Sequence, residues 1–178
     1  FVSELPDSIA MFLKAVDSEP MVLMAETYVL MAEAYLRGEQ YDAATAALDK
    51  FDGLVDADMP PMGRRKRAML QGMLLVKTGK FADAVAALTA SAPADDTELI
   101  SQLIVAQHYY WLAKALSGAG ADSATVQSSL EASYTALKAS ADSSAWFEEG
   151  LREELAKVVD EDEMPEKEFP RVKNLNPD

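Results

Sequence analysis

The most constraining feature of the sequence is an internal duplication of a helical pattern. Residues 28–51 and residues 68–91 each read as two amphipathic helices joined by a short polar turn that contains glycine. In each copy an aromatic residue, Tyr41 or Phe81, follows the turn and leads into an alanine-rich helix. One hairpin of this kind cannot bury its own apolar face. The duplication therefore predicts helical hairpins that stack side by side and share a core.

The composition agrees with a helical domain and excludes several other classes of protein. Of the 178 residues, 49% are hydrophobic, while glycine and proline contribute only 8 each. No run of alternating β-branched residues is present, so the sequence predicts an all-α protein with one core. The lack of cysteine excludes disulfides and thiol chemistry.

The residues at the repeated positions resemble those of the tetratricopeptide repeat (TPR) family. In that pattern a small residue lets two helices approach closely, and large residues fill the space around it. The matching residues are Tyr28, Met31, Ala32, Tyr35, Ala44, Leu48 and Phe51 in the first copy, and Ala68, Gln71, Gly72, Leu75, Ala84, Leu88 and Ser91 in the second. The copies lie 40 residues apart, from Ala44 to Ala84, against about 34 in a regular array. The resemblance implies a right-handed α-solenoid of TPR-like hairpins with about eight helices.

The expected domain organisation is a solenoid over residues 1–159 followed by a tail over residues 160–178. A first helix is expected over residues 6–16, after which the chain forms hairpins near 21–54, 63–91 and 97–139 and a closing helix over 143–159. The apolar face of the first helix is expected to hold Leu5, Ile9, Phe12, Leu13 and Val16. Two prolines in the connection 55–63 predict a firm stop before a helix that starts near Arg64. Asp122 or Ser123 is expected to cap the second helix of the third hairpin.

The tail is acidic and contains three prolines, a composition typical of an extended segment. An ordered segment of this kind needs a surface to lie on. Three apolar residues could anchor it: Phe169, Val172 and Leu175. Docking on its own domain and docking on another chain both stay open at this point.

Candidate catalytic residues are few. His108 is the only histidine, and a nucleophile would need a base and an orienting group around it. No histidine or cysteine cluster has the spacing of metal ligands, and residues 160–163 lack the glycine of a calcium loop. The glycines of residues 118–121 follow a helix instead of a strand, so they do not read as a dinucleotide-binding turn. We therefore expect a protein that is not an enzyme and that needs no cofactor or metal.

The net charge narrows the class of partner. The formal charge of −14 argues against nucleic acid and against an anionic membrane surface, because like charges repel. The longest apolar run is interrupted by Glu26 and Glu33, so no transmembrane segment is expected. These features predict a soluble protein, cytoplasmic by default, and the start at Phe1 leaves open a targeting segment removed before it.

One basic cluster stands out in this acidic chain: Arg64, Arg65, Lys66 and Arg67. Cations at a helix N-terminus oppose the helix dipole, so helix stability alone does not explain their position. Two explanations remain open. The cluster pairs locally with Asp52, Asp56 and Asp58, or it forms a basic edge that meets acidic residues of a partner.

The TPR resemblance also implies a binding surface, because in that family the first helix of each hairpin lines a concave face. The positions that match this face are Val29, Glu33, Leu36, Arg37, Lys66, Met69, Met73, Val76, Lys77, Tyr110 and Lys114. They would form an apolar groove with flexible methionines and basic edges, suited to a helix or an extended peptide that carries acidic and apolar residues. Glu33 and Met73 stand where a chaperone-tail receptor of the family would place asparagine.

The resulting expectation is a non-catalytic scaffold or adaptor subunit of a larger complex. It would hold a protein or peptide partner in the groove, with the tail as a second contact. A chaperone-like carrier that shields an apolar segment of its partner is the alternative. A small-ligand-binding helical protein is a third class, which would require a closed pocket with convergent polar groups.

Overall fold

The computed structural model describes residues 21–54, 61–92, 99–140 and 145–158. These residues form seven helices and no strand, as an all-α composition predicts. The helices are α2 (Met21–Arg37), α3 (Tyr41–Leu54), α4 (Pro61–Lys77), α5 (Phe81–Ala90), α6 (Leu99–Gly118), α7 (Ser123–Ala139) and α8 (Ala145–Leu155). The helix expected over residues 6–16 and the tail lie outside the described residues.

Most helix boundaries agree with the sequence prediction to within two residues, but the end of α8 and the start of α4 do not. The closing helix was expected to run to residue 159, whereas α8 ends at Leu155. The helix α4 begins at Pro61 instead of Arg64. Proline fits the first turn of a helix because backbone N–H groups there form no intrahelical hydrogen bond, so the N–H that proline lacks is not needed. The basic cluster therefore lies one turn inside α4. Since the helix dipole acts mainly on the first turn, the electrostatic cost of these cations is smaller than predicted.

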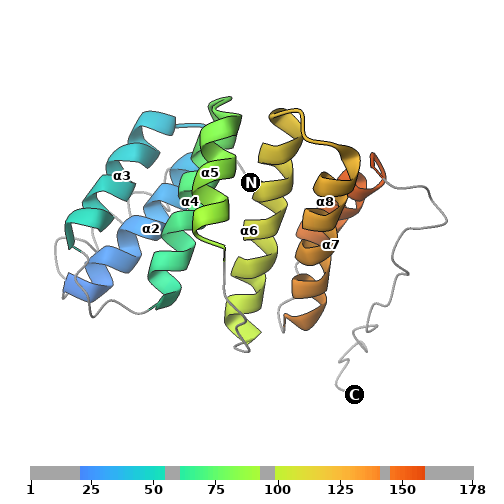
Figure 1. Cartoon of the computed structure of the whole chain (residues 1–178). Helices are drawn as coiled ribbons and strands as arrows, with labels where there is room; N and C mark the ends of the chain where they lie inside the picture. The colour runs from blue at the N-terminus through green and yellow to red at the C-terminus, as the bar shows by residue number, and fades with distance from the viewer. Residues whose placement is uncertain (1–20, 55–60, 93–98, 141–144, 159–178) are drawn as a thin grey trace, which may run out of the picture.

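The helices pack as successive antiparallel pairs. Figure 1 shows them side by side in a row, with α2 and α3 at one end and α7 and α8 at the other. The helices α2, α4 and α6 contact one another in succession, while α3, α5 and α7 each pack against the first helix of their own pair. The last helix, α8, packs on α7.

The three hairpin turns share one backbone conformation. Backbone N–H groups at residues 40, 80 and 121 each donate back to a carbonyl five residues earlier, with N···O distances of 2.8–3.0 Å. This bond satisfies a carbonyl that the helix end would otherwise leave without a partner. The residue before each donor has a positive φ: 58° at Glu39, 74° at Gly79 and 79° at Gly120. The third hairpin thus repeats the turn of the first two, although the duplicated sequence pattern covers only residues 28–51 and 68–91.

Two glycines allow helices to approach closely. A β-carbon at Gly72 in α4 would lie 2.3 Å from the Leu88 side chain of α5, and one at Gly118 would lie 2.3 Å from Phe81. Both distances are well inside van der Waals contact, so any larger residue would push the helices apart. Gly72 occupies the position where the sequence analysis expects a small residue for this purpose.

The core consists of three clusters that follow the order of the helices. One joins α2, α3 and α4, a second joins α4, α5 and α6, and a third joins α6, α7 and α8. Trp111 of α6 packs against both the first and the second cluster. Within the described ranges, no helix combines the length and the apolar character needed to cross a membrane.

Candidate binding pocket

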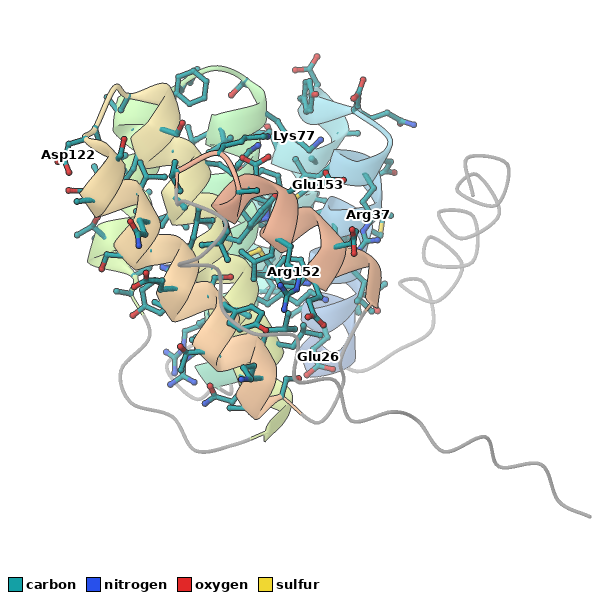
Figure 2. The ribbon with its side chains drawn as sticks, turned by 90° about the vertical axis from the view of Figure 1, so that its right-hand side faces the viewer. Glu26, Arg37, Lys77, Asp122, Arg152 and Glu153 are labelled. Atoms are coloured by element: carbon teal, nitrogen blue, oxygen red, sulfur yellow. The ribbon has the colours of Figure 1, made fainter. Side chains whose placement is uncertain are left out.

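A pocket of about 150 Å³ lies where α2, α4, α6 and α8 meet. These are the helices that the sequence analysis expects on the inner face, together with the closing helix. The lining residues are Glu33 and Arg37 of α2, Met69, Leu70 and Met73 of α4, Gln107, Tyr110 and Trp111 of α6, and Phe147 of α8. Figure 2 looks onto the side of the molecule that carries α8 and labels Arg37 of α2.

The apolar wall of the pocket comes from α4 and from an aromatic corner. Met73 lies four residues after Met69 and three after Leu70, so the three side chains share one side of α4, and all three are buried. On the opposite side, the ring of Tyr110 contacts Phe147 and Trp111 edge to face, with centroids 5.5 Å apart in both pairs. Edge-to-face packing fixes these rings, so the pocket has a firm aromatic side and an adaptable methionine side.

One end of the pocket carries a three-residue charge cluster. Glu33 Oε1 accepts a hydrogen bond from Arg37 at 2.7 Å, and Glu33 Oε2 lies 2.7 Å from Lys66 Nζ. Burial alone would raise the pKa of the Glu33 carboxyl, but Lys66 and Arg37 together have the larger effect, so its pKa lies below the ordinary value. Glu33 is therefore ionised at neutral pH. Among the described residues, two cations, Arg37 and Lys66, lie against this one carboxylate.

The other polar edge of the pocket lies beside Tyr110. Lys114 Nζ lies 3.0 Å from Glu154 of α8 and 6.0 Å from the centroid of the Tyr110 ring. Burial, with a smaller contribution from Glu154 and Glu153, raises the pKa of the Tyr110 hydroxyl. Tyr110 therefore stays protonated at neutral pH and can donate a hydrogen bond. The Lys114–Glu154 ion pair joins α6 to α8 and helps to hold the closing helix over the pocket.

The structure brings together five of the eleven groove residues expected from the sequence: Glu33, Arg37, Met69, Met73 and Tyr110. Val29, Leu36 and Val76 instead lie within the core, where they are at most 9% exposed. They pack between helices because the hairpins interlock more deeply than the expected open groove would require. Lys66 is engaged by Glu33, and Lys114 by Glu154. Lys77 lies at the C-terminal end of α4, where Figure 2 labels it.

Four lining residues were not among the expected ones: Leu70, Gln107, Trp111 and Phe147. Gln107 lies three residues before Tyr110 on the same helix face, so the helical period could have identified it. Trp111 and Leu70 adjoin expected residues in sequence. Phe147 had no such signal, because only the packing of α8 brings it to the pocket.

Two residues of the basic cluster, Lys66 and Arg67, pair with carboxylates of the described residues. Arg67 forms two hydrogen bonds to the Asp52 carboxylate, with 2.9 Å between Nε and Oδ1, and Lys66 pairs with Glu33 as described. Arg64 is exposed, and Arg65 lines a small cavity beside His108. Asp56 and Asp58 lie outside the described residues. Local pairing thus accounts for Arg67 and Lys66, although Glu33 is not among the partners expected from the sequence.

His108 is a core residue and lies away from the pocket. Its side chain is 3% exposed, and Nε2 lies 3.0 Å from the Leu88 carbonyl oxygen. Because a carbonyl can only accept, Nε2 carries the proton and donates to it. Burial lowers the pKa of His108, and the hydrogen bond opposes this only in part. The neutral imidazole therefore links α6 to α5 through this buried hydrogen bond.

Two further expectations concern the rest of the chain. Among the described residues, no group of three histidine, cysteine, aspartate or glutamate side chains could hold a metal ion. The expected tail anchors Phe169, Val172 and Leu175 lie outside those residues.

Comparisons with known proteins found no matching family model, no similar curated protein and no similar solved structure.

Proposed function

We propose that this chain is a non-catalytic scaffold or adaptor built as a TPR-like α-solenoid. In this proposal, the inner pocket accepts one apolar side chain from a peptide segment of a partner protein. The observation that carries the proposal is the position of the pocket, at the junction of four helices that come from different parts of the chain. A ligand there would touch every hairpin.

The size of the pocket favours a single side chain as its occupant. A volume of about 150 Å³ is enough for a benzene-sized ring. Pockets for whole drug-sized ligands span about 300–1,000 Å³. The methionine wall can adjust to a branched or an aromatic side chain, and the Tyr110, Trp111 and Phe147 rings favour an aromatic one.

The charge around the pocket favours acidic residues next to that side chain. Arg37 and Lys66 outnumber Glu33 at one end, and the Arg37 side chain is 51% exposed. A carboxylate of the partner could therefore approach the exposed part of the Arg37 side chain. The chain as a whole carries −14 and repels acidic segments, so the cations at this end mark the place where an acidic segment would meet the least repulsion.

A specific pocket favours an adaptor over a chaperone-like carrier. A carrier needs a broad exposed apolar surface to shield its cargo. Among the described residues, the exposed large hydrophobic side chains are Leu30 and Met62, and they lie on different helices. One pocket with a charged end suits a defined sequence motif better than a variable apolar segment.

The test uses a displayed library of random twelve-residue peptides selected on the intact chain. We expect enrichment of one aromatic or branched apolar residue flanked by aspartate or glutamate. Gln107→Trp places an indole into the pocket and should weaken the selected peptides by at least about tenfold, as loss of a buried anchor does. The measurement is the Kd of each peptide by fluorescence anisotropy.

Gln127→Trp provides the matched control, because it makes the same change on α7, away from the pocket. It should leave the Kd unchanged. If the selected peptides bind equally well to the Gln107→Trp variant, or if they lack an apolar residue at a fixed position, the proposal is wrong.

A further inference from the structure

A second, apolar groove runs along the first hairpin, at the end of the row formed by α2 and α3 (Figure 1). It consists of two adjoining cavities of about 600 and 190 Å³ that share Tyr28, Ala46 and Lys50. The remaining lining residues are Met24, Met31, Tyr35, Ala43, Ala47, Asp49, Gly53 and Leu54. Among the described residues, none from α4 or a later helix lines either cavity, and none is shared with the inner pocket.

The shape of this groove follows from the residues on its two sides. On α2, Met24, Tyr28, Met31 and Tyr35 recur every three or four residues and form a continuous ridge of large side chains. On α3, the facing positions are mostly alanine and glycine. A ridge beside a row of small residues leaves a trough into which the ridge of another helix can pack.

The other hairpins of the described chain do not leave this position open. The first helix of the second hairpin, α4, is covered by α2 and α3, and α6 is covered by α4 and α5. By the same packing, α2 would be covered by the element that precedes it in the chain. Within the described residues nothing occupies that place.

We propose that residues 5–16 of the same chain form an amphipathic helix that docks in this groove. Leu5, Ile9, Phe12, Leu13 and Val16 fall on one face at helical spacing. That face would lie against Tyr28 and the alanines of α3, and the opposite face would stay in water.

Length and connection fit this occupant. The stretch from Leu5 to Val16 and the ridge from Met24 to Tyr35 each cover eleven residue steps, or about 16 Å as helix. Residues 17–20 would form the connection to α2. They number four, as do residues 119–122 between α6 and α7, and Pro20 disfavours a helical residue before it.

Charge also favours this segment over a second copy of the chain. Residues 1–20 carry four carboxylates and one lysine, a net charge of −3 against −11 for the rest of the chain, and the groove is lined by Asp49 as well as Lys50. Two whole chains of charge −14 would repel each other more strongly than this segment and the remaining chain do. A tethered segment instead meets the groove at an effective concentration of about millimolar.

The lack of native cysteine makes a direct test possible. Ala46→Cys places one thiol on the exposed floor of the groove. Its rate of alkylation by iodoacetamide should rise by about tenfold when Phe12→Glu and Leu13→Glu remove the apolar stripe, because the docked state excludes the reagent. Ala86→Cys, exposed on α5, is the control, and its rate should not change.

A second measurement keeps the apolar stripe largely intact and identifies what covers the groove. Cysteine at Ile9, Phe12 or Val16, combined with Ala46→Cys, should give an oxidised monomer that migrates faster on a non-reducing gel. Thr45→Cys, which is exposed but does not line the groove, should not cross-link. The proposal is overturned if oxidation gives only cross-linked dimers, which would assign the groove to a second copy. It is equally overturned if the double glutamate variant leaves the alkylation rate of the Ala46→Cys thiol unchanged and no pair cross-links.

Discussion

At the scale of single residues, the turn between α2 and α3 holds Glu39 in a left-handed conformation, with φ at 58°. The equivalent residues of the next two turns are Gly79 and Gly120, which adopt positive φ without a β-carbon clash. Glu39 has no such freedom, so this turn stores conformational strain that the other two avoid.

Glu39→Gly should therefore stabilise the protein. The relief of the left-handed conformation is worth about 1–2 kcal/mol, and the greater flexibility of glycine in the unfolded chain offsets part of it. We expect a net gain of roughly 0.5–1 kcal/mol in the free energy of unfolding, measured by urea denaturation. Glu39→Ala retains the β-carbon and should give no such gain. A Glu39→Gly variant no more stable than wild type would contradict this account of the turn.

The titration of His108 makes the stability of the folded protein depend on pH. Its pKa in the folded state lies below the ordinary 6.5, so between these two values the unfolded state binds more protons. The stability that neutral His108 contributes is therefore present above about pH 6.5 and is lost as the pH falls.

The test compares wild type with His108→Gln, which cannot titrate, by urea denaturation at pH 7.5 and pH 5.5. Wild type should lose more stability over this range than the variant, by up to about 1.4 kcal/mol for each pH unit below 6.5. Equal losses would show that His108 does not carry this dependence. Carboxylates that titrate near the lower pH affect both proteins, so they cancel in the comparison.

At the scale of helices, the hairpin α4–α5 depends on the missing side chain at Gly72. A β-carbon there would lie 2.3 Å from Leu88, whose side chain is fully buried. Gly72→Val should lower the free energy of unfolding by about 1–3 kcal/mol, because overpacking moves α4 away from α5. Thermal denaturation followed by circular dichroism would measure the change.

Gly150→Ala is the control for this prediction, since a β-carbon at Gly150 of α8 meets nothing within 4 Å. There the better helix propensity of alanine should raise stability by about 0.5–1 kcal/mol. If both variants were stabilised, close packing at Gly72 could not be the reason for its glycine.

The helices themselves could be predicted from the sequence because their signals are local. Helical periodicity and the two polar turns predict α2 and α3 with their observed bounds. Asp122 was expected as one of two candidate caps, and its carboxylate accepts from the Thr125 N–H at 2.9 Å. The predicted start of α4 was wrong, because a proline can occupy the first turn of a helix as well as end one.

The pocket was only partly predictable, because several of its lining residues are brought together by packing between helices that are distant in sequence. Glu33, Met69 and Met73 followed from the repeat pattern. The depth of packing at Val29 and Leu36 did not, since a pattern of apolar residues cannot distinguish an open wall from a core. Phe147 comes from α8, more than thirty residues after Tyr110, and no local spacing connects the two.

At the scale of the whole molecule, three core clusters follow one another along the row of helices instead of forming one central core. Stability in such an arrangement is close to a sum of local contributions and of contacts between neighbours. The ends of the row can then open without the middle. The residues that join adjacent clusters decide whether the chain behaves as one unit.

Trp111 is such a residue, and it also forms part of the wall of the inner pocket. A ligand in contact with the Trp111 indole would stabilise the first and the second core cluster together, because Trp111 packs against both. Melting that runs in stages for the empty protein would merge into one sharp transition when a peptide is present. Trp111 would report that change through its fluorescence, which a Trp146→Phe variant would isolate because the chain has two tryptophans.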